Sequence, residues 1–192
     1  MILLAEYLKT KGLNKELIAT ILDVGTEINF SKGATVTKEG VVEQYLYFIQ
    51  QGGCRFFITR NRDAEEITFQ FAFQGEFVNS LLSMKYQSPS QFTIETICPT
   101  NLWTCHKKTW QNLLNTYPII KQLYQDILED LFTLKLKREI QMLKNSPEEQ
   151  YLELLEQHKE IFQEVPLKHI ATYIGITPQS LSRLRKRILK KK

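Results

Sequence analysis

The hydrophobic period of the sequence changes near residue 107, and this change limits the fold more than any other feature. Before it, Ile67, Phe69 and Phe71 alternate with polar residues, which is the period-two pattern of a half-buried β-strand. After it, apolar residues recur three and four positions apart as far as about residue 145, the spacing of an amphipathic helix. We therefore predict an α+β protein in which a β domain precedes a helical segment.

The region 26–106 is predicted to form an antiparallel β-roll of the double-stranded β-helix or jelly-roll type. Its apolar runs are short, and glycines separate them. The run Tyr45–Ile49 is apolar on both faces, so it belongs inside a two-layer structure. Residues 1–25 carry apolar positions at helical spacing and are predicted to add one or two flanking helices.

The helix predicted over residues 107–145 carries a heptad seam. The seam residues fall at steps of four and three, and they are Ile120, Tyr124, Ile127, Leu131 and Leu134. Such a seam packs against a copy of itself, so we predict a homodimer. Further apolar residues widen the surface beyond the seam, and an ordinary core helix that covers the sheet is therefore the alternative.

A new helix is predicted to begin after Ser146. This residue is a good N-cap, a proline follows it, and Glu149 completes a capping box. We expect the helix to extend to about Phe162. Its start divides the chain into two predicted domains, 1–145 and 146–192.

The charge of the chain is divided in a similar way. Residues 165–192 contain eight Lys and Arg residues and neither Asp nor Glu, whereas the other 164 residues contain 17 basic and 21 acidic residues. A basic end on an acidic body is typical of a module that binds a polyanion. On charge alone, a solvated basic tail is the alternative.

Residues 168–191 have the pattern of a helix-turn-helix. The apolar stripes of its two helices are Ile170, Ala171 and Ile174 in the first, and Leu181, Leu184 and Ile188 in the second. Gly175 stands where a left-handed turn would end the first helix, and Thr177 and Pro178 are a good N-cap and first residue for the second. This spacing predicts two tightly crossing helices. A basic surface helix in another all-helical module is the alternative.

With its apolar stripe buried, the second helix would present polar and basic residues to the major groove of DNA. Since Gln pairs with adenine and Arg with guanine, we predict that Gln179 and Arg183 read bases, with Ser180 beside them. The residues predicted to contact phosphates are Thr177, Arg185, Lys186 and Arg187.

A β-roll, a long helix and a terminal helix-turn-helix, in this order, resemble the Crp/Fnr family of bacterial transcription regulators over nearly the whole chain. In the roll the resemblance rests on Lys32-Gly33, Gly40, Tyr47–Ile49 with Gly52, and Gly75 to Phe77. In the basic end it rests on Val165-Pro166 and Ile170–Arg185. The chain is similar to the short Crp-like proteins of Bacteroidetes-type bacteria, in which the wing after the recognition helix is reduced or absent.

The resemblance implies a homodimeric, sequence-specific DNA-binding regulator that reads a palindromic operator, with RNA polymerase as a further partner. It also implies an effector pocket in the cyclic-nucleotide-binding-like roll. The residues that the resemblance assigns to this pocket are Gly75, Glu76, Phe77, Ser90 and Gln91.

The pocket residues depart from those of relatives that bind cyclic AMP. Such relatives use a Gly-Glu pair for the ribose and, across a short loop, an Arg for the phosphate. Here Ser90 or Gln91 stands at the position of that Arg, and Lys85 is the nearby basic residue. A buried phosphate without a cationic partner costs several kcal/mol, so we expect an effector other than cyclic AMP. An unidentified small molecule, a protein partner and no ligand are all open.

The sequence predicts no cofactor, no bound metal and no catalytic activity. The three cysteines Cys54, Cys98 and Cys105 form no CxxC pair, which argues against an iron–sulfur cluster and a zinc ribbon. Haem would need axial ligands in the roll, and the adjacent pair Cys105-His106 points to opposite faces of a strand. The sequence contains no GxSxG, P-loop, HExxH or dinucleotide fingerprint.

The sequence also lacks a membrane-spanning pattern. Its longest stretch without Asp, Glu, Lys or Arg, residues 169–182, has 14 residues, whereas a membrane helix needs roughly 20. The first residues are too short an apolar run for a signal peptide and meet Glu6 at once, so we expect a cytoplasmic protein. A ligand- or protein-binding sensor whose basic end does not read DNA is the alternative function.

Overall fold

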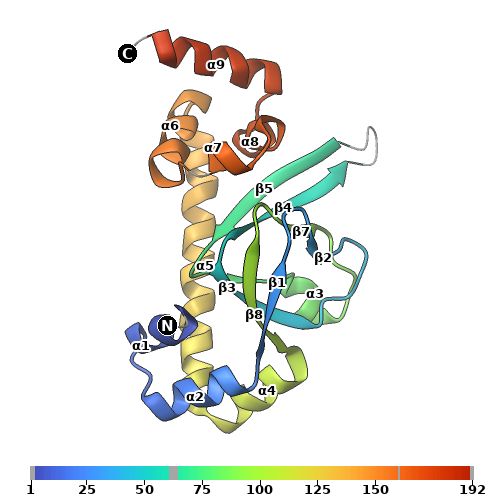
Figure 1. The fold of residues 1–192 in the computed structure, drawn as a ribbon, viewed down its shortest axis with the longest axis vertical. Coiled ribbons are helices and arrows are strands. Elements are labelled where there is room, and N and C mark those ends of the chain that lie inside the picture. Colours follow the sequence, from blue (N-terminus) through green and yellow to red (C-terminus); the bar gives the residue numbers. More distant parts are fainter. Residues whose placement is uncertain (1–2, 61–64, 160, 191–192) are drawn as a thin grey trace. The chain divides into compact units, whose positions relative to one another are not determined.

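The computed structural model describes residues 3–60, 65–159 and 161–190. It confirms the predicted order of two short helices, a β region and a helical end (Figure 1). The chain divides into two compact units, Met1–Phe56 with Phe71–Ile127 and Phe57–Gln70 with Leu128–Lys192. Among the described residues, no helix is both long enough and apolar enough to cross a membrane.

The β region is an antiparallel roll, as predicted. Its strands are β1 (Thr26–Phe30), β2 (Thr35–Thr37), β3 (Tyr45–Gln51), β4 (Gly53–Arg60), β5 (Glu65–Phe73), β6 (Phe77–Val78), β7 (Thr93–Thr96) and β8 (Thr100–His106). Within the described ranges they form two sheets, in the orders β1-β8-β3-β6 and β2-β7-β4-β5. Phe48 and Leu102 of the first sheet and Cys54 and Ile94 of the second are completely buried, so the two sheets share one core.

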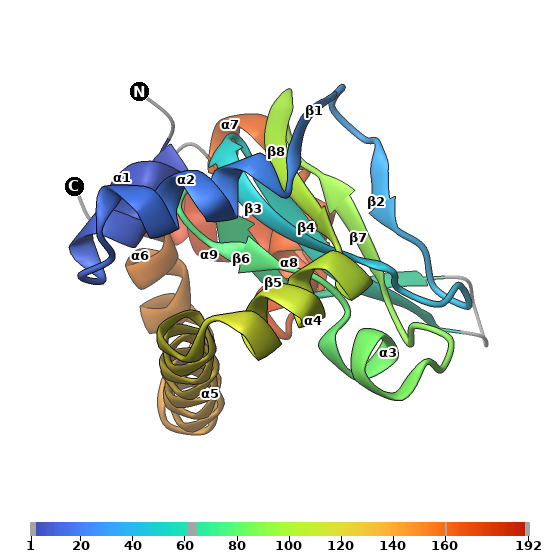
Figure 2. The same ribbon diagram turned by 90° about the horizontal axis from the view of Figure 1, so that it is seen from below.

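Helices flank the roll within the first unit. The predicted N-terminal helices are α1 (Leu3–Thr10) and α2 (Lys15–Asp23). The ring of Tyr7 in α1 lies 5.5 Å from that of Phe48, which fixes α1 on the core. The sequence did not predict α3 (Leu81–Tyr86), a short helix at the edge of the roll (Figure 2).

The prediction of one helix over residues 107–145 is wrong. The chain forms two helices, α4 (Lys107–Thr116) and α5 (Pro118–Lys144). Between them Tyr117 is extended, with φ −121° and ψ 98°. The residue before a proline is sterically disfavoured from the helical region, so Pro118 ends the first helix and begins the second.

The second unit contains the remaining helices, α6 (Pro147–Gln157), α7 (Ile161–Glu164), α8 (Leu167–Ile174) and α9 (Pro178–Lys190). The predicted capping box is present, because the Glu149 carboxylate accepts the Ser146 N–H at 2.7 Å and the Ser146 hydroxyl accepts the Glu149 N–H. Hydrogen bonds donated to the Glu149 carboxylate by the Ser146 hydroxyl, at 2.7 Å, and by the Ser146 N–H lower the pKa of Glu149. However, α6 ends near His158, earlier than expected. The predicted domain boundary coincides with the break before α6 and stays a prediction.

The prediction that β5 is half-buried is wrong where the strand lies in the second unit. Thr68, on the face expected to be polar and exposed, is completely buried, and its N–H donates to Thr172 Oγ1 of α8 at 3.1 Å. In the same unit, Lys135 of α5 donates to Gln70 at 2.6 Å. The face of the strand that carries Thr68 and Gln70 is therefore covered, and period-two alternation alone did not reveal this helical cover.

Gly52 provides a test of the roll. It has φ +93°, and a Cβ there would lie 2.7 Å from the Pro99 carbonyl oxygen. Gly52→Ala is expected to lower the free energy of unfolding by about 2–4 kcal/mol, from left-handed strain plus a backbone clash. Gly40 has φ +83° with nothing within 4 Å of a Cβ, so Gly40→Ala should cost about 1 kcal/mol. Denaturant unfolding measures both, and equal losses would refute the role of the close approach.

Candidate functional site

A left-handed turn at Gly175 joins α8 to α9 at the predicted position. Gly175 has φ 81° and ψ 26°, and its N–H points to the carbonyls of Ala171 and Thr172. The next residue, Ile176, donates its N–H to the Ala171 carbonyl at 2.9 Å. These bonds close the end of α8 in a conformation that glycine adopts without strain. The turn therefore fixes where α9 begins.

The predicted apolar stripes form the contact between α8 and α9. Leu181 and Leu184 of α9 are buried, as are Ala171 and Ile174 of α8. Ile188 is half-buried. Because Ala171 is small, the two helices approach closely at this point.

The residues predicted to contact DNA lie on or just before α9. Those exposed to solvent are Thr177, Gln179, Arg183, Lys186 and Arg187, while Ser180 and Arg185 are half-buried. Thr177 is the N-cap, as predicted, since its hydroxyl accepts the Ser180 N–H at 3.2 Å. The Ser180 hydroxyl oxygen lies 3.0 Å from Thr177 Oγ1 and accepts from Arg183 at 3.4 Å. These three side chains form one polar row along the helix.

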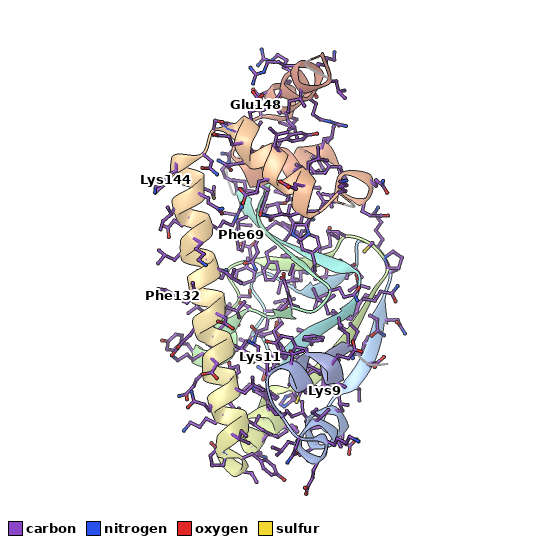
Figure 3. The ribbon with its side chains drawn as sticks, turned by 90° about the vertical axis from the view of Figure 1, so that its left-hand side faces the viewer. Lys9, Lys11, Phe69, Phe132, Lys144 and Glu148 are labelled. Carbon is purple, nitrogen blue, oxygen red and sulfur yellow. The ribbon has the colours of Figure 1, made fainter. Side chains whose placement is uncertain are left out.

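A groove of about 480 Å³ lies beside this row. Its lining residues come from the start of α6 and from α9 with the turn before it, and they are Ser146, Pro147, Glu148, Ile176, Ser180, Arg183, Leu184 and Arg187. Arg187 forms an ion pair across the groove with Glu148, which is labelled in Figure 3. The sequence interpretation missed this pairing, because the two residues lie 39 positions apart.

The predicted effector residues occupy different surroundings in the roll. Gly75 has φ +91° and forms a turn, with Glu76 exposed beside it. The ring of Phe77 lies 4.9 Å from Phe48 and belongs to the core. Ser90 is buried, whereas Gln91 is exposed. Glu76 and Ser90 thus differ in environment, and their assignment to one pocket stays a prediction.

Ser90 belongs to a buried cluster of hydroxyl groups. Its Oγ lies 2.9 Å from Ser80 Oγ and 2.8 Å from the Phe92 carbonyl oxygen. Nearby, the Ser83 hydroxyl accepts the Glu43 N–H at 2.9 Å, and the Glu43 carboxylate accepts the backbone N–H of Tyr45 at 2.9 Å. The polar groups of this part of the roll are therefore satisfied by one another.

A buried cation that the sequence interpretation missed is Arg55. Its Nε and Nη2 both lie 2.9 Å from Glu95 Oε1, and its side chain is only 5% exposed. An arginine within an otherwise apolar strand was the available signal, because buried charges are paired. The Arg55 guanidinium is therefore ion-paired with Glu95.

The predicted dimer seam is divided between two environments. Ile120 and Ile127 are buried within the first unit, and Tyr124 packs edge-on to Trp110 at 5.8 Å. Ile120 and Ile127 are therefore not available to a second copy, which corrects the prediction for these two residues, whereas Tyr124 is half-buried and its role stays a prediction. Leu131 is half-buried, and Leu134 is 61% exposed.

A different set of apolar side chains is exposed on the second half of α5. Phe132, labelled in Figure 3, is 68% exposed, and Leu136 and Leu143 are exposed as well. Their spacing of four and seven residues places all three on one face of the helix. The predicted seam, which includes Leu134, lies on the other side of the helix.

The cysteines have the character of core residues. Burial and, secondarily, the nearby Cys98 raise the pKa of Cys54 to about 12, and burial raises the pKa of Cys105 to about 11. Both thiols are therefore protonated near neutral pH. In the described part of the chain, no three His, Cys, Asp or Glu side chains are grouped so that they could hold a metal ion.

Residues 27–117 match the model of the cyclic nucleotide-binding domain family. Among curated proteins, the cAMP-dependent protein kinase regulatory subunit of Blastocladiella emersonii is 21% identical over 122 residues, which is 63% of this chain. The aligned part is 30% of that protein, so the chain spans less than a third of the relative's length.

Solved structures of Crp/Fnr-type regulators are similar over most of the chain. The c-di-GMP-responsive global regulator CLP of Xanthomonas campestris has a TM-score of 0.74 at 16% identity, covering 93% of both chains. FixK2 of Bradyrhizobium japonicum has a TM-score of 0.69 at 16% identity and covers 88% of this chain and 86% of its own. A CooA variant of Carboxydothermus hydrogenoformans has a TM-score of 0.68 at 18% identity, covering 98% and 84%. These likenesses show the fold, an antiparallel cyclic nucleotide-binding roll with several helices.

Alkylation tests the state of the cysteines. Because the pKa of both Cys54 and Cys105 is raised, their thiols stay protonated near pH 8 and are also shielded by burial. Iodoacetamide is expected to label the half-buried Cys98 first and the other two only after unfolding in denaturant. Mass spectrometry of peptides measures the order. Labelling of folded protein at Cys54 as fast as at Cys98 would contradict the assignment.

Proposed function

We propose that the chain is a cytoplasmic, homodimeric transcription regulator of the Crp/Fnr type that binds DNA in a sequence-specific manner. The observation that carries the proposal is the exposed basic and polar face of α9, held on α8 by the left-handed turn at Gly175. The likeness in fold to CLP, FixK2 and CooA supports it. RNA polymerase is a further partner that the family resemblance implies.

The roles of the α9 side chains follow from their place on the helix. Gln179 and Arg183 are exposed in the first turns, where a recognition helix meets base edges. Lys186 and Arg187 are exposed in the later turns, and with Arg185 they are assigned to phosphates. Thr177 is assigned to a phosphate at the helix N-terminus, where its capping bond already places the hydroxyl.

The effector, where one acts, is proposed to differ from cyclic AMP. The position at which relatives place an arginine for the cyclic phosphate holds the buried, hydrogen-bonded Ser90 or the exposed Gln91. The nearby buried cation, Arg55, is paired with Glu95. A phosphate buried in this region would have to compete with Glu95 for Arg55 or draw in the exposed Lys85, which opposes binding.

Selection of duplex DNA from a random pool tests the function directly. The purified dimer, with no small molecule added, is expected to enrich a palindrome with half-sites about 34 Å apart. Arg183→Ala should cost about 1–3 kcal/mol and relax the preference at one base position. Arg185→Ala should weaken binding to all sequences and lower the salt slope by about 1.

A different result from this selection would favour the alternative function. Enrichment of no sequence, together with equal losses from Arg183→Ala and Arg185→Ala on every duplex, would favour a sensor module whose basic end does not read DNA. The same pool selected in the presence of cyclic AMP should give the same palindrome at the same affinity.

Two exposed residues of α5 test where the dimer forms. Phe132 and Leu134 are 68% and 61% exposed, but they lie on opposite sides of the helix. Phe132→Glu is expected to give monomers in sedimentation equilibrium, because it places a charge in the apolar face shared with Leu136 and Leu143. Leu134→Glu is the matched control and should remain dimeric. The reverse result would restore the heptad seam predicted from the sequence.

A further inference from the structure

The groove beside α9 contains an acidic residue within the face proposed to contact DNA. Glu148 lies in the first turn of α6, and its carboxylate is paired with the guanidinium of Arg187. Arg183 and Ser180 line the same groove. The Glu148 carboxylate therefore lies beside the polar row of α9, which contains Ser180 and Arg183.

The exposure of the two partners indicates how the pair responds to a ligand. The Arg187 side chain is 59% exposed, whereas that of Glu148 is 26% exposed. Arg187 thus remains accessible to an incoming phosphate, while Glu148 is held on the wall of the groove. Any anion that approaches Arg187 must compete with a carboxylate already in place and is repelled by it.

The cost of this competition is modest. A solvent-exposed ion pair contributes little to stability, so DNA is able to break it. Loss of the pair nevertheless leaves the Glu148 carboxylate next to a phosphate of the same charge, and the two repel each other. The helix N-terminus stabilises the carboxylate where it stands, since acidic side chains are favoured in the first turn.

We propose that Glu148 is an intramolecular competitor of the DNA phosphate for Arg187, which lowers the affinity for DNA irrespective of base sequence. This inference rests on the proposed function and adds a means by which the chain limits its own non-specific binding. Base contacts from Gln179 and Arg183 then account for a larger share of the affinity, because a phosphate contact is weakened.

The competitor has a specific salt signature. When Arg187 leaves Glu148 for a phosphate, the carboxylate that remains beside the DNA retains part of the cations that the contact would otherwise release. Without the carboxylate, the same contact releases its counterion in full. Removing the charge of Glu148 should therefore make the dependence of log K on log salt steeper, by up to about 0.9.

The experiment compares Glu148→Gln with Glu156→Gln. Glu156 is an exposed carboxylate on the same helix and outside the groove lining, so its substitution changes the net charge equally. Binding of the full chain to the selected operator and to an unrelated duplex is measured over a range of salt. Glu148→Gln is expected to bind both duplexes about two- to fivefold tighter than Glu156→Gln, with the steeper slope. Circular dichroism confirms that each variant is folded.

A double-mutant cycle with Arg187→Gln tests the same pair from α9. Arg187→Gln should weaken binding less in the native background than in Glu148→Gln, because only the latter leaves Arg187 fully available. Equal affinities and slopes for Glu148→Gln and Glu156→Gln, or an additive cycle, would overturn the inference while the DNA-binding function stands. Failure of the native chain to bind any duplex would instead overturn the function, and the inference with it.

Discussion

The left-handed turn at Gly175 is the constraint on which the basic end of the protein depends. It ends α8, sets the start of α9 and brings Leu181 and Leu184 onto Ala171 and its neighbours. Once that stripe is buried, helical geometry leaves the polar and basic residues of α9 exposed on the opposite side. The polar row follows from this crossing, and the groove and the Arg187–Glu148 pair form where α9 meets the start of α6.

The roll combines an apolar core with a small number of buried polar groups that are paired with one another. Its two antiparallel sheets enclose a shared apolar core, and the family match over residues 27–117 coincides with the roll and α4. Near the residues that the sequence analysis assigned to an effector, buried hydroxyls such as Ser80 and Ser90 are hydrogen-bonded to each other. The chain also neutralises the buried Arg55 with Glu95. The packing of the core determines the fold, whereas a few polar side chains determine which ligand could bind. The fold alone therefore does not identify a ligand.

Much of the fold could be predicted because its signals are local. Ser146, Thr177 and Gly175 act on residues three or four positions away, and all three are found in the predicted capping or turn roles. The errors arise where a local rule was overlooked or where distant segments intervene. The break before Pro118 follows from a local steric rule that the helical spacing concealed. The burial of Thr68 depends on a helix that lies about a hundred positions further along the chain.

The sequence by itself determined the antiparallel roll, its N-terminal helices and the exposed polar and basic face of α9, because periodicity and capping are encoded within a few residues. Only the tertiary structure decided which apolar residues of α5 are buried against the rest of the chain and which, such as Phe132, remain exposed. It alone paired Arg55 with Glu95 and Arg187 with Glu148. Partners separated by about forty positions meet only after the elements between them have packed, and no spacing in a linear sequence records that meeting.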